Sequence, residues 1–162
     1  ISLVDEPRLK FENDYVVIGD ATGRSSVKYF FSDPEMLTSP ANTIKMPEPE
    51  VKFTLDSDTL KKVKRAAAAL GHDEISITPV TGAIRLSVLD SKDATSNNYS
   101  IDVEGDYPDV KFQFILNVGN LKVVNEDFEV GISSKLISKF TSKQSTTEYY
   151  IALEKTSTYG EA

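Results

Sequence analysis

The sequence of 162 residues contains no cysteine, no tryptophan and a single histidine, His72. Without cysteine, the chain has neither disulfides nor thiolate metal sites, which is typical of proteins in a reducing cytosol. One histidine and scattered carboxylates do not supply a nucleophile, a base and an orienting group in one pattern. We therefore expect no enzymatic activity, no metal site and no cofactor.

Long hydrophobic runs are also missing. No apolar stretch approaches the length that crosses a membrane, and the first residues do not resemble a signal peptide. A hydrophobic fraction of 40% is nevertheless enough to bury a core, in one domain or in two small ones. These features predict a soluble, cytoplasmic protein with no membrane partner.

Positive charge is scarce but concentrated. The chain has 18 Lys and Arg against 25 Asp and Glu, a formal net charge of −7, yet Lys61, Lys62, Lys64 and Arg65 fall within five consecutive positions. A solvent-exposed helix face explains such a cluster, because Lys and Arg are good helix formers. A surface that contacts phosphates explains it as well. The residues alone leave both explanations open.

The cations lie in the stretch that most clearly predicts a helix, residues 56–71. Asp56 can cap its first turn, and Gly71 can take the positive φ that ends a helix. Its apolar residues recur at helical spacing and form one narrow face: Leu60, Val63, Ala66, Ala67 and Leu70.

Around this helix the sequence predicts mostly strands. Residues 8–31 read as a three-stranded meander, in which the loop GDATGRSS (19–26) is a hairpin turn, because no helix follows it as in a phosphate-binding loop. Four prolines between residues 32 and 50 indicate a connector. Two units with the order β-α-β-β-β follow. The first comprises 51–55, the helix, 74–78, 83–89 and 98–104. The second comprises 110–115, a short, weakly helical piece at 116–123, and 128–133, 136–140 and 149–154.

With this repeat, the chain resembles the DNA sliding clamps of T4-like bacteriophages, which are polymerase processivity factors. The similar stretches are ISLVDEPRLKF (1–11), IKMPEPEVKFTLDSDTLKKVKRAAAALGHDEISITPV (44–80), VKFQFILNVGNLKVV (110–124) and YYIALEKTSTYGEA (149–162).

The resemblance implies an α+β fold, the DNA clamp (processivity) fold, in which repeated β-α-β-β-β units carry helices on one face of antiparallel sheets. It implies that residues 1–38 are a remnant of the first clamp domain, 39–50 an interdomain connector, and 51–162 a complete second domain. The earlier part of the first domain has no counterpart in this sequence.

The same resemblance implies a role for the cations. Clamps are closed rings with helices on their inner wall, so Lys61, Lys62, Lys64 and Arg65 are expected to face double-stranded DNA, with Lys122 as a further contact. An acidic exterior repels the duplex, and contacts to phosphates alone leave the ring able to slide.

Ring closure in the family joins edge strands of neighbouring subunits, and a trimeric ring is expected for the full-length protein. By position, Val27 and Tyr29 of the strand 26–31 are expected to meet Tyr99 and Ile101 of the strand 98–103 in the next subunit. Both strands also read as ordinary edge strands, which Lys28 or Asp102 protects from pairing.

Clamps also bind short peptide tails of the polymerase and the clamp loader in an apolar pocket beside the connector. The expected pocket residues are Ile44, Met46, Tyr150, Ile151 and Ala152. Alternating residues of a C-terminal strand are equally typical of a core.

The sequence therefore predicts a non-enzymatic sliding clamp subunit that encircles duplex DNA and tethers the replicative polymerase, in the host cytoplasm if the protein is viral. The alternative is a viral all-β structural or assembly protein whose basic helix packs at a subunit contact.

Overall fold

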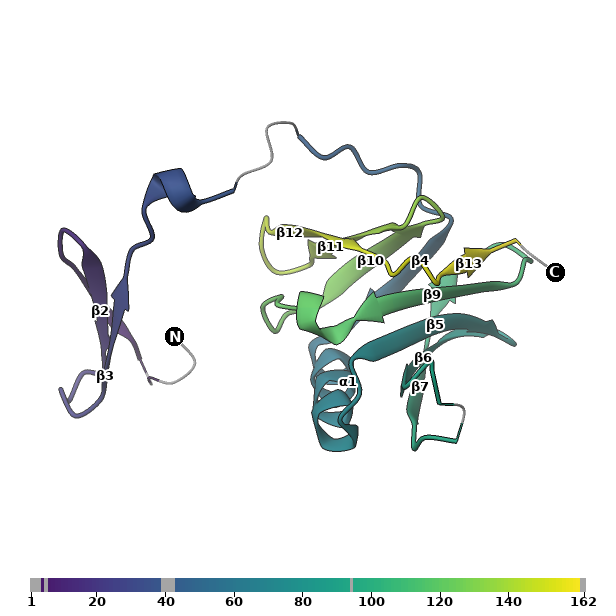
Figure 1. The fold of residues 1–162 in the computed structure, drawn as a ribbon, viewed down its shortest axis with the longest axis horizontal. Helices are drawn as coiled ribbons and strands as arrows, with labels where there is room; N and C mark the ends of the chain where they lie inside the picture. The colour runs from purple at the N-terminus through teal and green to yellow at the C-terminus, as the bar shows by residue number, and fades with distance from the viewer. Residues whose placement is uncertain (1–3, 5, 39–42, 94, 161–162) are drawn as a thin grey trace. The chain divides into compact units, whose positions relative to one another are not determined.

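A computed structural model of the chain describes residues 4, 6–38, 43–93 and 95–160. The chain divides into two compact units, Ile1–Thr43 and Ile44–Ala162, which are described separately (Figure 1). Part of the predicted connector, residues 39–42, lies outside the described residues.

The first unit is an antiparallel sheet with the order β1-β2-β3, as the meander predicted. Its strands are β1 (Arg8–Phe11), β2 (Tyr15–Gly19) and β3 (Ser26–Phe30). Val16 and Ile18 of β2 are buried with Val4. The loop before β3 is a hairpin turn, because the Asp20 carboxylate accepts hydrogen bonds from the backbone N–H groups of Thr22 (2.8 Å) and Arg24 (3.2 Å).

A short 3₁₀ helix, η1 (Pro34–Met36), follows β3, although the sequence did not predict it. The Asp33 carboxylate accepts a hydrogen bond from the backbone N–H of Glu35 at 2.9 Å. Proline suits the first helical position, because it has no backbone N–H that would be left without a partner there.

The second unit consists of two five-stranded sheets and one helix. One sheet has the order β12-β11-β10-β4-β8 and the other the order β13-β9-β5-β6-β7. The elements of the first module are β4 (Val51–Leu55), α1 (Ser57–Leu70), β5 (Glu74–Val80), β6 (Ala83–Leu89) and β7 (Tyr99–Val103). The elements of the second are β9 (Phe112–Asn117), η2 (Val118–Asn120), β10 (Phe128–Ser133), β11 (Ile137–Ser142) and β12 (Glu148–Ala152). Two-residue strands, β8 (Gly105–Asp106) and β13 (Thr158–Tyr159), complete the sheets.

The two modules exchange their leading strands. β4 of the first module pairs with β10 of the second, with Phe53 opposite Val130. β9 of the second module pairs in the same antiparallel manner with β5 of the first, with Phe114 opposite Ile77. Neither module therefore builds its sheet alone, and the repeat predicted from sequence forms one folding unit.

The predicted helical piece at 116–123 is wrong. Leu116 still belongs to β9, and only the three residues of η2 are helical. Val118 and Gly119 are poor helix formers. Beyond η2, buried Leu121 and Val123 alternate with exposed Lys122, which is an extended pattern. The helix of the second module is thus reduced to one turn.

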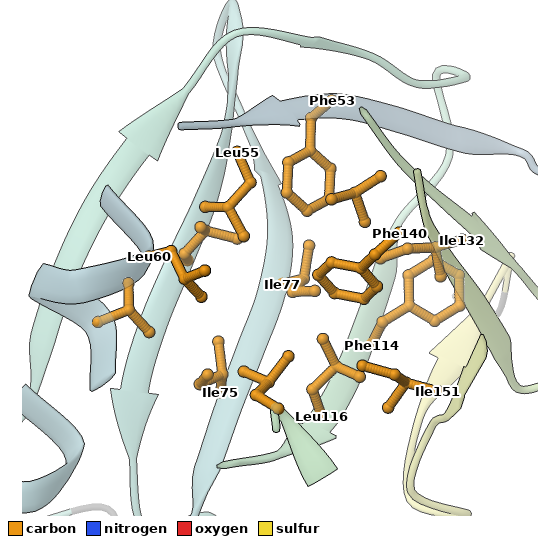
Figure 2. Close-up of a cluster of buried hydrophobic side chains, with 14 of the residues drawn as sticks. Phe53, Leu55, Leu60, Ile75, Ile77, Phe114, Leu116, Ile132, Phe140 and Ile151 are labelled. Carbon is orange, nitrogen blue, oxygen red and sulfur yellow. The ribbon is translucent and has the colours of Figure 1, made fainter. Parts of the chain in front are cut away.

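The buried faces of the two sheets and of α1 meet in one hydrophobic core (Figure 2). Phe53, Phe128 and Phe140 come from one sheet, and Ile77 and Phe114 come from the other. Helix α1 contributes the three buried apolar residues of its predicted stripe: Leu60, Val63 and Ala67. Burying each large aliphatic side chain contributes about 1.5–3 kcal/mol, so this stripe fixes which side of α1 faces outward.

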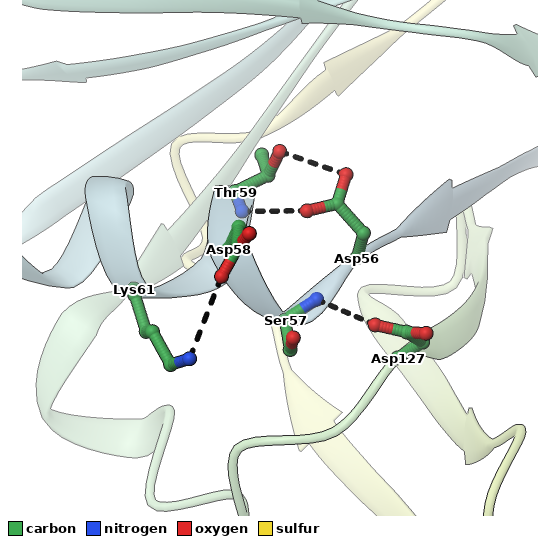
Figure 3. Close-up of polar contacts among 6 residues, drawn as sticks. All are labelled: Asp56, Ser57, Asp58, Thr59, Lys61 and Asp127. Carbon is green, nitrogen blue, oxygen red and sulfur yellow. Dashed lines mark hydrogen bonds and ion pairs between the residues drawn. The ribbon is translucent and has the colours of Figure 1, made fainter.

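Helix α1 begins and ends as the sequence predicts. The Asp56 carboxylate accepts hydrogen bonds from the backbone N–H (2.7 Å) and the hydroxyl (2.9 Å) of Thr59, and Asp127 accepts the backbone N–H of Ser57 at 2.7 Å (Figure 3). Gly71 ends the helix at φ 70°, in the left-handed conformation that glycine adopts without strain.

The Asp56 cap makes stability depend on pH. The hydrogen bonds from Thr59, the backbone N–H first, lower the pKa of Asp56 below 3.8. The stabilisation is therefore complete above the ordinary pKa of an aspartate and is lost as the pH falls through the lowered pKa. We expect Asp56→Ala to destabilise the protein by about 1 kcal/mol at pH 7, measured by urea denaturation. Asp56→Asn should keep most of this stability at pH 7 and lose the acid dependence of this position. Equal acid dependence in wild type and Asp56→Asn would contradict the assignment.

Candidate functional site

The outward side of α1 carries three exposed cations, Lys61, Lys62 and Arg65. Lys61 forms an ion pair with Asp58, one turn earlier, at 3.4 Å (Figure 3). Both of these side chains are largely exposed, so the pair contributes little to stability and does not fix the ammonium group. All three cations are exposed to solvent, as a surface that contacts phosphates requires.

Lys64 differs from its three neighbours. Its side chain is half-buried, its Nζ donates a hydrogen bond to the backbone carbonyl of Val123 at 3.3 Å, and burial lowers its pKa. Lys64 therefore ties α1 to the segment after η2 and is less available to an external anion. Lys122, on that same segment, is exposed.

A second candidate site is a groove on the outer face of the sheet β12-β11-β10-β4-β8. It has a volume of about 300 Å³. The chain before β4 forms one wall with Met46, Pro47, Glu48 and Pro49; outward residues of three strands form the floor: Lys52, Glu129, Gly131, Lys139 and Thr141. Gly131 lets the proline wall lie close to the floor, because a Cβ at this position would be only 3.1 Å from Cβ of Pro49 and the proline would have to shift.

Glu50 holds the wall segment, residues 46–49, against the sheet. Its carboxylate accepts hydrogen bonds from the hydroxyl (2.6 Å) and the backbone N–H (2.9 Å) of Ser134, in the turn after β10. Partial burial acts in the opposite direction, but these hydrogen bonds lower the pKa of Glu50 below its usual value. Glu50 is therefore charged at neutral pH and fixes the end of the segment to the sheet.

The five pocket residues expected from the sequence are dispersed. Met46 lines the groove, whereas Ile44 is exposed before it. Tyr150 lies on the same sheet face, with its ring centroid 5.6 Å from Nζ of the groove residue Lys139. Ile151 is buried in the core, and Ala152 is exposed at the end of β12 opposite Ile137. The sequence did not predict that the strand residues of the floor line a groove. The one signal for them in the sequence is that they alternate with apolar residues, which predicts that they face outward.

The four residues expected at a subunit contact lie on two edge strands. Val27 and Tyr29 are on β3, the last strand of the sheet β1-β2-β3. Tyr99 and Ile101 are on β7, the last strand of the sheet β13-β9-β5-β6-β7. Tyr29 is 60% exposed. Val27, Tyr99 and Ile101 are half-buried.

No cluster of three or more histidine or acidic side chains with the spacing of a metal site occurs among the residues that the structure describes. Within the same residues, no helix is both long enough and apolar enough to span a membrane.

The doubled module of antiparallel sheets, with a cationic helix on it, is the architecture of a sliding clamp. The sequence model described as the C-terminal domain of the gp45 sliding clamp matches residues 52–155, more than half of the chain, and the chain belongs to this family. The assignment does not favour the all-β structural alternative.

Individual relatives agree with the family. The sliding clamp of Vibrio phage KVP40 is 29% identical over 160 residues, which cover 95% of this chain and 71% of the phage protein. Two solved structures have a similar fold. The beta sliding clamp of C. crescentus superposes with a TM-score of 0.55 at 17% identity, over 92% of this chain and 40% of the clamp. A. fulgidus PCNA, bound to the C-terminal region of FEN-1, superposes with a TM-score of 0.54 at 15% identity, over 91% of this chain and 63% of PCNA. The chain thus spans less than two thirds of either structure.

The Glu50 contact can be tested by hydrogen exchange. We expect Glu50→Ala to accelerate exchange of the Ser134 amide about tenfold, because the lost hydrogen bond contributes about 1.4 kcal/mol. The matched control is Glu48→Ala, since among the described residues the side chain of Glu48 forms an exposed ion pair with Lys52 and no contact with Ser134. An unchanged Ser134 exchange rate in Glu50→Ala, measured by NMR, would show that Glu50 does not hold the segment.

Proposed function

We propose that this chain is part of a sliding clamp, a non-enzymatic ring subunit that encircles double-stranded DNA and tethers a replicative DNA polymerase. The observation that carries the proposal is the cationic side of α1, on the one long helix of the described residues, in a protein of net charge −7. A negative exterior disfavours DNA everywhere except at such a surface.

In this proposal the duplex is bound through its phosphates by Lys61, Lys62 and Arg65. Lys122 is a further contact, and Lys64 contributes less because its ammonium group is bound to the Val123 carbonyl. Contacts of this kind do not read the base sequence. The affinity is expected to be weak and to fall steeply with salt, since each phosphate contact releases counterions.

Residues 1–38 are proposed to be the end of a preceding clamp domain, 39–50 the connector and 51–162 the following domain. The family match over residues 52–155 supports the last assignment. The small separate core of the first unit, with Val4, Val16 and Ile18, supports the first.

Charge reversal tests DNA binding. We expect Lys61→Glu/Lys62→Glu/Arg65→Glu to lower duplex affinity at least about a hundredfold at low salt and to abolish polymerase stimulation. Each cation that contacts a phosphate contributes about 0.9 to the slope of log affinity against log salt. Fluorescence anisotropy at several salt concentrations and primer extension measure the two effects.

The control for charge reversal changes the same net charge at exposed lysines away from α1, as Lys111→Glu/Lys135→Glu/Lys155→Glu. It should retain most of the affinity and the stimulation. If both triple variants lose binding equally, net charge and not the α1 surface attracts the duplex. If neither loses it, the chain does not act as the proposed clamp.

The outer groove is proposed to bind short peptide tails of the polymerase and of the clamp loader. The supporting observations are its apolar wall, formed by Met46, Pro47 and Pro49, and the place of these residues at the end of the proposed connector. The A. fulgidus PCNA structure, which has the same fold, holds a C-terminal protein segment. The charged floor residues Lys52, Glu129 and Lys139 provide partners for charges on such a tail.

Peptide binding has its own test. Met46→Ala should weaken binding of the C-terminal peptide of the polymerase about tenfold, or about 1.4 kcal/mol, because an apolar wall is lost. Ile44→Ala is the matched control, since Ile44 belongs to the same segment but does not line the groove. Isothermal titration calorimetry measures both. Equal losses in the two variants would place the peptide outside the groove.

A further inference from the structure

The outer groove continues beyond Lys52 and Glu129. These two side chains also line a second hollow of about 540 Å³, which extends past β4 to the short edge strand β8. The hollow is completed by Phe53, Thr54, Gly82, Glu104, Gly105 and Asp106. Because Lys52 and Glu129 line both, the groove and the hollow form one depression on the outer face of the sheet. Its apolar end is formed by Met46, Pro47 and Pro49, and its acidic end by Glu104 and Asp106.

The strand register places the two ends in line. On the outer face, Gly131 of β10 lies opposite Lys52 of β4, and Lys52 lies opposite Asp106 of β8. Pro49 of the apolar end lies against Gly131. Neighbouring strands are about 4.8 Å apart, so two strand spacings, or about 10 Å, separate the ends. An extended peptide rises about 3.3 Å per residue and spans this distance with about three residues.

Gly105 allows β8 to lie close to β4. A Cβ at this position would be only 2.6 Å from the carbonyl oxygen of Lys52 and 2.7 Å from Cβ of Phe53. The residues on either side of the glycine, Glu104 and Asp106, are both exposed and both line the hollow. The close approach of the two strands therefore brings two carboxylates to the far end of the depression.

The charges around the depression are not balanced. Its cations already have acidic partners within the chain: Lys52 with Glu48 (3.2 Å), Lys139 with Glu148 (2.6 Å) and Lys143 with Glu129 (3.1 Å). Among the residues that the structure describes, no ion pair includes Glu104 or Asp106. The acidic end therefore offers two carboxylates to a cation from outside the chain.

We infer that the depression binds one extended peptide that has an apolar residue and, about three residues away, lysine or arginine side chains. The apolar residue packs against the apolar end, and the cations pair with Glu104 and Asp106. Nucleic acid does not suit this surface, because carboxylates repel phosphates. Exposed ion pairs are individually weak, so the apolar end supplies most of the affinity and the acidic end selects basic tails. The inference rests on the proposed peptide binding and specifies the chemistry of the tail.

Fluorescence anisotropy with synthetic peptides tests this preference. Two alanine-based decapeptides carry a leucine-phenylalanine pair, with two lysines about three residues before it in one and about three residues after it in the other. Each has a matched peptide with glutamates in place of the lysines. We expect one lysine peptide to bind at least about tenfold more tightly than its glutamate match at low salt, because like charges at the acidic end repel.

Charge reversal at the acidic end is the decisive variant. Glu104→Lys/Asp106→Lys should reverse the preference toward the glutamate peptide, a gain that loss of folding cannot produce. The matched control is Asp73→Lys/Asp109→Lys, which makes the same charge change at two exposed aspartates that do not line the depression. This control should keep the preference for lysine. Met46→Ala should weaken binding of the lysine peptide.

A reversal in Glu104→Lys/Asp106→Lys alone supports the inference. Equal binding of lysine and glutamate peptides, an equal change in both double variants, lysine-peptide binding that Met46→Ala leaves unchanged, or no binding of any peptide overturns it.

These outcomes are separable from failure of the proposed function. The expected preference without stimulation of primer extension would refute the polymerase role and leave the peptide chemistry standing. Stimulation that persists in Glu104→Lys/Asp106→Lys, together with peptides that show no charge preference, would refute only this inference.

Discussion

The burial of one apolar stripe on α1 determines the other properties of this helix. Leu60, Val63 and Ala67 enter the core that both sheets share, and this fixes the rotation of the helix about its axis. The rotation leaves Lys61 exposed on one flank and turns Ala66 and Ala69 toward Tyr99 on the other. The same hydrophobic contact therefore positions the proposed DNA surface.

That core exists only because the two modules exchange their first strands. β4 completes the sheet of β10, β11 and β12, and β9 completes the sheet of β5 and β6. Loss of either strand would leave the sheet that it completes with an open edge in the middle of the fold. The arrangement also explains how η2 can replace a helix, since Leu121 and Val123 still reach the core without one.

Local signals in the sequence were sufficient for most elements. Alternating apolar residues predicted the strands, and the Asp56 cap with Gly71 predicted both ends of α1. Long-range effects were not predictable. The burial of Lys64 depends on the Val123 carbonyl, which is far away in sequence. The groove floor depends on strand order, which brings Lys52, Glu129 and Lys139 together from three strands. The Leu116–Val123 piece was predicted to be weakly helical, but its end is extended, with buried Leu121 and Val123 on either side of exposed Lys122.

The hydrogen bond from Lys64 to Val123 has a consequence for movement. A protein that diffuses along a charged polymer must break and remake every ionic contact at each step, so its friction grows with the number of firmly held cations. With Lys64 engaged by its own fold, the helix offers fewer charges, all on flexible stems. In the proposed role, this smaller number of contacting cations favours fast sliding over tight binding. The polymerase is then retained at the template because the ring encloses the DNA, and not because the clamp binds the DNA strongly.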